Sequence, residues 1–177
     1  EIQEIQLNAY RNSAKAMHED DKNLFNHIVS EEMLNISSTD GITFYERKHD
    51  IMEFKLLKNR SIGTDMGGIS KHIPLHPRQL YDGKGNPNLQ SVVTNVFHTG
   101  KAIVIKDLYK EKTFDFSGAK AFDKNTGYKS KSVLVMPIKD YQGDVQGVIQ
   151  MINAQDFETG ESIPFNKQII NDLENFI

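Results

Sequence analysis

The sequence predicts an α+β fold built around a mainly antiparallel sheet. Apolar and polar residues alternate at residues 42–45 and 52–56, and a polar turn at residues 48–50 separates these two segments. Residues 132–138 and 145–153 form a second pair, rich in β-branched side chains. Both pairs are typical of β-hairpins. Since hairpins join antiparallel neighbours, and helical segments surround them, the class is α+β rather than doubly wound α/β.

Two helices are predicted before the first hairpin. Residues 2–17 carry an imperfect apolar stripe, which the acidic group of residues 19–21 interrupts. Asp21 suits the N-cap of a second helix, whose apolar residues follow the i, i+4 spacing of one helix face. This second helix should end at the Ser-Ser-Thr-Asp-Gly run of residues 37–41, which is a strong helix breaker.

Between the hairpins, residues 59–87 are rich in glycine and proline and are predicted to form mostly loop, with a short strand at residues 73–75. A helix should follow this loop. Asn86 suits its N-cap, Pro87 suits its first position, and Gly100 suits its exit.

The remaining predicted elements are a strand at residues 102–106 and a final helix that begins near Ser162 or Pro164. The apolar stripe of that helix still runs at Ile177, and the chain begins with Glu1 rather than Met. We therefore expect a piece of a longer protein. Its parts would be a linker or dimerisation helix over residues 1–20, a domain over 21–163, and a helix over 164–177 that leads toward an effector domain.

The composition narrows the possible functions. The formal net charge of −3 lacks the clustered positive charge that binding to nucleic acid requires. The chain contains no cysteine, which excludes disulfides, thiolate nucleophiles and cysteine-bound zinc, and fits a reducing, cytoplasmic compartment. No apolar run reaches the roughly 18 residues of a membrane span, so we expect no direct membrane contact from this segment.

The most informative stretch is FDFSGAKAFDKNTGYKSKSVLVMPI, from Phe114 to Ile138. It is predicted to be a long polar loop, rich in aromatic and hydroxyl side chains, that leads into an apolar strand. Long loops inside a compact domain are often functional. This loop has none of the usual components of a catalytic site, so we expect a binding site and a regulatory, non-enzymatic role.

Three segments of the chain resemble a GAF domain, in particular those of cyclic-nucleotide phosphodiesterases, adenylate cyclases and bacterial HD-type phosphohydrolases. They are GNPNLQSVVTNVFHTGKAIVIKDLY, the stretch from Phe114 to Ile138, and GDVQGVIQMINAQD. The resemblance implies a GAF/PAS-like fold: a six-stranded antiparallel sheet with helices on one side and a ligand pocket under loops on the other. It also implies a module that binds a small molecule, dimerises through flanking helices and signals to an attached effector.

In family members that bind cyclic nucleotides, the resemblance places ligand contacts at Thr126, Ser130 and Gln150, with apolar and backbone contacts near Val92 and Val93. One departure bears on the ligand. Asn153 and Phe165 match the family's spaced Asn-Lys, Phe, Asp-Glu signature, but Ala154 stands in place of the lysine, and Ile169-Ile170 stand in place of the acidic pair. The expected ion pair cannot form, which argues against cyclic-nucleotide binding but not against a pocket.

The same stretch offers further candidate ligand contacts, each with a structural alternative. Phe116 and Tyr128 are suited to stack on a planar ligand or to pin the loop to the sheet. Asp123 is suited to accept a hydrogen bond from a ligand or to cap a turn. Thr126 and Ser130 are suited to orient a ligand or to satisfy loop backbone groups.

We predict no metal site and no phosphate-binding loop. The His49-Asp50 pair lies in a predicted turn without partner ligands, and prolines make a helix unsuited to the segment between His72 and His76. The glycines at residues 67–68 and 83–85 lack the spacing of a P-loop. The main expectation is therefore a sensory domain that binds a small, possibly nucleotide-like molecule. The alternative is a dimerisation scaffold with a degenerate pocket and no ligand.

Overall fold

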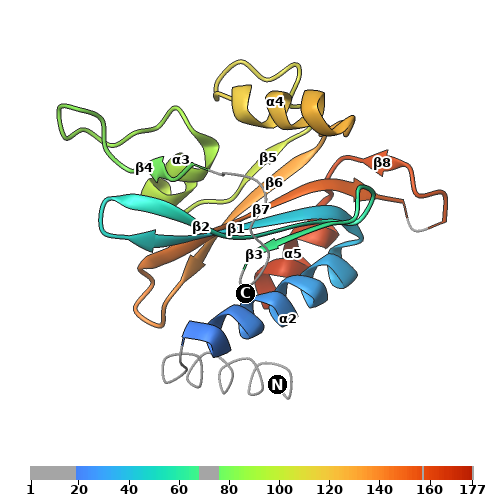
Figure 1. Ribbon diagram of the computed structural model, residues 1–177, viewed down its shortest axis with the longest axis horizontal. Helices are drawn as coiled ribbons and strands as arrows, with labels where there is room; N and C mark the ends of the chain where they lie inside the picture. Colours follow the sequence, from blue (N-terminus) through green and yellow to red (C-terminus); the bar gives the residue numbers. More distant parts are fainter. Residues whose placement is uncertain (1–18, 68–75, 157, 177) are drawn as a thin grey trace.

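The computed structural model describes residues 19–67, 76–156 and 158–176 (Figure 1). A curled antiparallel sheet forms its centre, with the strand order β3-β2-β1-β7-β6-β5. The expected six-stranded antiparallel sheet is thus confirmed. Its strands are β1 (Thr39–Lys48), β2 (Ile51–Asn59), β3 (Thr64–Gly67), β5 (Ile103–Ile105), β6 (Val133–Lys139) and β7 (Val145–Gln155). Two short strands extend the sheet: β4 (Arg78–Gln79) pairs with β2, and β8 (Ser162–Ile163) pairs with β7.

Both predicted hairpins are confirmed. β1 and β2 pair through a tight turn in which His49 has a positive φ of 54°. β6 and β7 pair through the turn that precedes Val145, where Gly143 has a positive φ of 90°. The long strands β1 and β7 pair with each other, so the two hairpins form one continuous sheet.

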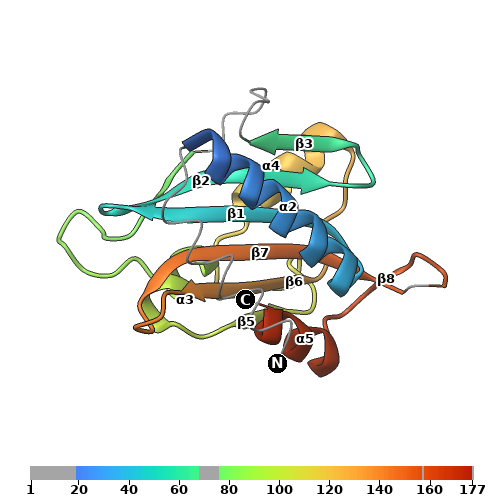
Figure 2. The same ribbon diagram turned by 90° about the horizontal axis from the view of Figure 1, so that it is seen from below.

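Helices lie on both faces of the sheet. α2 (Glu19–Ser37) and α5 (Lys167–Phe176) cover one face, and Figure 2 shows α2 across the strands and α5 near β5 and β6. α3 (Val92–Thr99) and α4 (Ser117–Thr126) lie over the other face (Figure 1). That second face was expected to hold a pocket under loops. It carries two helices together with loops.

The alternation of side chains along the strands separates two apolar cores. In β6, Val133 and Val135 face α3, whereas Leu134 and Met136 face α2 and α5. All four side chains are buried. A strand that is apolar on both faces needs cover on both, which explains why β6 reads as a continuous apolar run.

Several predicted boundaries were wrong. The helix expected to begin after Asn86 begins at Val92, because residues 80–88 pair with themselves instead. Asp82 N–H donates to the Asn86 carbonyl at 2.8 Å, and Asn88 N–H donates to the Leu80 carbonyl at 2.8 Å. The predicted exit of this helix at Gly100 is confirmed, with φ 62° and a bond to the Val96 carbonyl.

The stretch predicted as a long loop contains α4. Phe116, Ala119 and Phe122 lie close to one face of this helix, and Gly127 ends it in the left-handed conformation at φ 74°. The helix was not predicted because most of its other residues are polar, so the spacing of its few apolar residues gave only a weak helical pattern.

Other corrections concern the ends of the chain. Asp21 lies inside α2 rather than at its N-cap, and the acidic group of residues 19–21 is helical. The last helix begins at Lys167, because Ser162 and Ile163 form β8 against β7. The predicted helix at residues 2–17 and strand at residues 73–75 lie outside the described residues.

Candidate functional site

A cavity of about 570 Å³ lies between the sheet and the helices α3 and α4. This size falls in the range of sites for small organic ligands. Strands β1, β2 and β7 form its floor, the start of α3 forms one wall, and α4 with the following segment forms its roof. The walls are mainly apolar, with side chains from Leu57, Val92, Val93, Phe116, Phe122 and Ile152.

Two polar side chains lie at the centre of the floor. Thr43 of β1 and Gln150 of β7 are directly opposite each other in the antiparallel register, and both line the cavity. Thr43 is 4% exposed. Among the described residues, no hydrogen bond reaches the Thr43 hydroxyl or the Gln150 amide. Buried polar groups normally have partners, so this pair is available to a ligand.

A network around Asp123 attaches the end of α4 to the start of β6. The carboxylate of Asp123 accepts hydrogen bonds from Ser130 N–H at 2.8 Å, from the Ser130 hydroxyl at 2.7 Å and from the Tyr109 hydroxyl at 2.7 Å. The bond to the carboxylate raises the pKa of Tyr109. Asp123 and Ser130 are both buried. This network holds the roof against the sheet.

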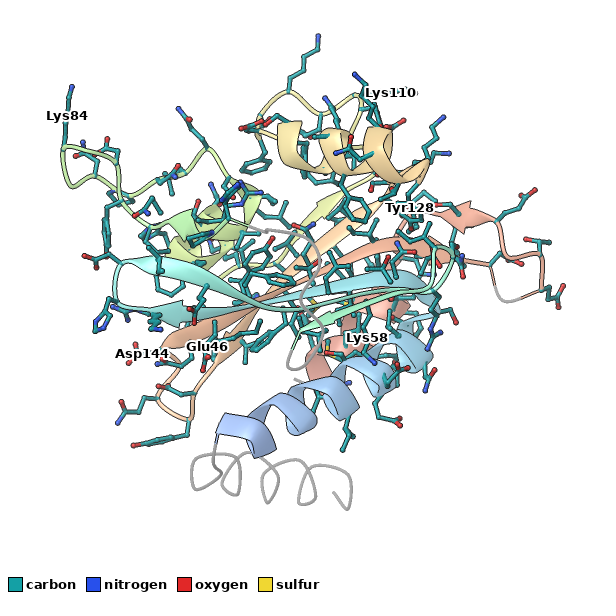
Figure 3. All side chains as sticks on the ribbon, viewed as in Figure 1. Glu46, Lys58, Lys84, Lys110, Tyr128 and Asp144 are labelled. Carbon is teal, nitrogen blue, oxygen red and sulfur yellow. The ribbon has the colours of Figure 1, made fainter. Side chains whose placement is uncertain are left out.

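Asn153 organises the neighbouring end of β7. It has a positive φ of 55°, and its side chain bonds Lys131 N–H at 2.7 Å, the Tyr128 hydroxyl at 2.8 Å and the Lys129 carbonyl at 2.9 Å. Tyr128 lies at the end of α4, above the sheet (Figure 3). Burial and the nearby Asp40 carboxylate raise the pKa of the Tyr128 phenol.

The lining of the cavity includes a cation that the sequence analysis missed. Arg78 of β4 lines the cavity beside Tyr45 of β1. The Tyr45 side chain is buried, and burial raises the pKa of its phenol, although the neighbouring Arg78 guanidinium lowers that pKa in part. Arg78 belongs to a strand of only two residues, which is too short to show an apolar pattern, so the sequence does not indicate its position.

The cavity brings together all of the predicted site residues except Asp123: Val92, Val93, Phe116, Thr126, Tyr128, Ser130 and Gln150 line it. Asp123 bonds Ser130 and Tyr109 instead. The hydroxyl of Ser130 donates to Asp123, and the hydroxyl of Thr126 donates to the Phe122 carbonyl at 2.8 Å. The structural alternatives therefore apply to these two hydroxyl groups in this state. Thr43, Tyr45 and Arg78 are lining residues that were not predicted.

Apolar residues occupy the positions where the family signature has a lysine and an acidic pair. Ala154 is fully buried in the core that faces α2 and α5, and Ile169 and Ile170 pack against the same core. Phe165 lies in that core as well. Hydrophobic contact therefore attaches α5 where the family signature would place charges.

The metal motifs considered in the sequence form no metal site in the described part of the chain. No group of three His, Cys, Asp or Glu side chains suited to hold a metal occurs there. His49 lies in the β1–β2 turn, and His72 lies outside the described residues. No described helix is long and apolar enough to cross a membrane.

Comparison with known proteins agrees with this architecture. The GAF domain model matches residues 24–175. The chain belongs to the GAF domain family.

Curated relatives match only part of this GAF domain. The dual 3′,5′-cyclic-AMP and -GMP phosphodiesterase 11 of Drosophila melanogaster is 39% identical over 38% of the chain and 4% of that protein's length. The cGMP-specific 3′,5′-cyclic phosphodiesterase of the same organism is 43% identical over 33% of the chain and 5% of that protein's length. The chain thus spans a small fraction of each phosphodiesterase, which is consistent with a non-catalytic, regulatory domain.

Solved GAF domains share the fold at low sequence identity. The GAF domain/HD domain protein from Geobacter sulfurreducens has a TM-score of 0.58 at 11% identity, and the match covers 92% of this chain and 90% of that one. The GAF domain of an Acinetobacter phosphoenolpyruvate-protein phosphotransferase has a TM-score of 0.57 at 13% identity, with 98% and 87% covered.

Proposed function

We propose that this GAF domain is a sensory module that binds a small molecule in the cavity under α4 and passes its binding state to an attached effector. The observation that carries the proposal is the pair of Thr43 and Gln150. Their polar groups have no partner among the described residues and lie on the floor of a cavity of about 570 Å³. A scaffold with a degenerate pocket would be expected to fill this space with its own side chains.

The nature of the ligand is a separate part of the proposal. The phosphodiesterase relatives act on cyclic nucleotides, and a nucleotide-like ligand fits the size of the cavity. The apolar residues Ala154, Ile169 and Ile170 argue against the family's cyclic-nucleotide mode, because no ion pair forms there. We therefore propose a small-molecule ligand without restricting it to cyclic nucleotides.

We further propose that the domain is cytoplasmic and works as a homodimer through its terminal helices. Ile28 and Ile36 of α2 are 42% and 41% exposed, so this helix has apolar side chains to offer a second copy. In this view, residues 1–20 form a linker or dimerisation helix, and residues 164–177 lead toward the effector. Sedimentation velocity of the chain tests the dimer.

Thermal-shift screening with a metabolite set that includes cyclic AMP and cyclic GMP, followed by calorimetry, tests ligand binding. A ligand at a hundredfold excess over its dissociation constant should stabilise the domain by about 2.7 kcal/mol. Thr43→Val and Gln150→Ala should each weaken binding roughly three- to tenfold, because each removes one hydrogen bond to the ligand.

Gln168→Ala is the matched control for these variants, since Gln168 lies on α5, away from the cavity, and bonds Asp172 at 2.8 Å. It should leave binding unchanged. Failure of every metabolite to raise stability would argue for the scaffold alternative.

A further inference from the structure

Arg78 is a cation of the cavity that forms no ion pair within the described part of the chain. It lies on β4, where its backbone pairs with Met52 of β2, and it lines the cavity. No carboxylate of the described residues lies within ion-pairing distance of its guanidinium. Lys58 is also among the residues that line the cavity, but its ammonium forms an ion pair with Glu31 on the α2 side of the sheet.

The position of Arg78 is fixed by three neighbours. Its guanidinium lies beside the Tyr45 phenol. A Cβ atom on Gly118, in the first turn of α4, would lie 3.2 Å from Arg78 Nη2, so the absence of a side chain at Gly118 leaves room for the guanidinium against the roof. Asp115 is close enough for Arg78 to contribute to the lowered pKa of that carboxyl, but the main cause is its bond from Ser117 N–H at 2.8 Å.

Further donors lie on the same side of the cavity. Tyr45 keeps its proton at neutral pH, because burial raises the pKa of its phenol, and the described residues offer no acceptor for its O–H. Ser91, Val92 and Val93 at the start of α3 line the cavity, and no side chain caps that helix. A guanidinium, a phenol and free helix N–H groups all favour a negatively charged partner.

We propose that the ligand of this domain is an organic anion, whose phosphate or carboxylate group binds Arg78 and Tyr45 while its uncharged body lies against the apolar walls. This inference rests on the proposed function and names the class of ligand that the site takes. Arg78 is then the residue that determines specificity, because a guanidinium matches the planar geometry of a carboxylate and the oxygens of a phosphate.

Two matched pairs of compounds test this class by calorimetry on the whole chain. Guanosine 5′-monophosphate is compared with guanosine, and indole-3-acetate with indole-3-acetamide. Each pair keeps the body and changes the charge, and the two pairs distinguish a phosphate from a carboxylate. The anion of at least one pair should bind roughly tenfold or more tightly than its neutral partner.

Variants of Arg78 and Tyr45 test whether these residues cause the preference for the anion over its neutral partner. Arg78→Gln should weaken binding of the anion roughly ten- to a hundredfold and leave the neutral partner almost unchanged. Arg78→Lys should retain part of the preference, and Tyr45→Phe should reduce it while keeping the ring. Arg47→Gln is the matched control, because Arg47 stacks on Phe97 at 5.5 Å and does not line the cavity. It should change nothing.

Either of two outcomes would overturn the inference. Equal binding of anion and neutral partner, or an unchanged preference in Arg78→Gln, would refute it while the proposed function stands, provided that Thr43→Val weakens the neutral compound. A purely structural Arg78 would lower thermal stability in Arg78→Gln without changing the ratio of affinities. If neither these compounds nor the metabolite set raises stability, the proposed function itself fails.

Discussion

Single side chains hold the roof of the cavity, and the pKa of one of them, Tyr128, is raised by its surroundings. Its hydroxyl accepts a hydrogen bond from Asn153, and its ring lies edge-on to Phe122 of α4 with 6.5 Å between ring centroids. The phenol is partly buried near the Asp40 carboxylate, and both effects disfavour the phenolate. The folded domain therefore requires Tyr128 to be protonated.

This requirement predicts a loss of stability at high pH. The pKa of Tyr128 is raised in the folded state, so above about pH 10 the unfolded chain releases the proton before the folded domain does, and stability falls. The loss should approach about 1 kcal/mol per pH unit. Urea denaturation between pH 8 and pH 11 measures it. Tyr128→Phe should make the fall in stability less steep, and the raised pKa values of Tyr45 and Tyr109 account for the part that stays. Tyr141→Phe is the control, since that side chain is 82% exposed. A curve unchanged by Tyr128→Phe would contradict the assignment.

Several residues that line the cavity were expected before the structure, but their bonding was not. A family resemblance indicated Thr126, Ser130 and Gln150, and all three line the cavity. The resemblance did not show that the Ser130 hydroxyl donates to Asp123, because that bond depends on where α4 ends. Thr43 could not be identified as a cavity residue from the sequence, because it belongs to an alternating strand pattern like its neighbours. Only the pairing of β1 with β7 places it opposite Gln150.

At the scale of elements, the long strands and amphipathic helices were predictable and the short ones were not. The apolar patterns of β1, β2, β6, β7 and α2 reflect burial over many residues, which local sequence reports well. β4 and β8 have two residues each, too few to carry a period. Their strand conformation comes from the neighbouring strands β2 and β7.

The attachment of α4 gives a second prediction. Asp123→Asn removes the charge that accepts three hydrogen bonds and places an amide N–H₂ group where an acceptor is needed. Unfolding free energy should fall by about 1–3 kcal/mol. Urea denaturation measures this, with Asp144→Asn in the exposed β6–β7 turn as the matched control. Hydrogen exchange should increase in α4 more than in β1. Equal stability of Asp123→Asn and the control would show that other contacts hold the roof.

At the scale of the molecule, one sheet separates the cavity from α2 and α5. α2 contacts β1, β2 and α5. The side chain of Lys58 is 4% exposed, points to the α2 side of the sheet and pairs with Glu31 of α2 (Figure 3). Arg60 adds a bond to Asn35 of α2 at 2.6 Å. Polar contacts thus complement the apolar core in fixing this helix on the sheet.

The Lys58–Glu31 ion pair predicts that removing one partner destabilises the domain more than removing both. Glu31→Gln leaves the Lys58 ammonium buried without this counter-charge, and should lower unfolding free energy by about 1–3 kcal/mol, because the half-exposed glutamate is partly screened by water. Adding Lys58→Met should recover part of that loss, since the buried charge is then absent. Lys48→Gln, at an exposed ion pair with Glu53, should cost under about 0.5 kcal/mol. Chemical denaturation of the unchanged chain and the three variants measures these differences. A double variant with a lower unfolding free energy than Glu31→Gln alone would contradict the prediction.

The register of β1 has a consequence for how this domain tolerates change. Thr43 faces the cavity, whereas Ile42 lies in the core on the side of α2. Adding or deleting a single amino acid within β1 would exchange these two faces along the strand. An apolar side chain would then face the cavity, and a hydroxyl group would face the core beneath α2. Length variation among descendants of this chain should therefore gather in the connecting segments and spare the floor.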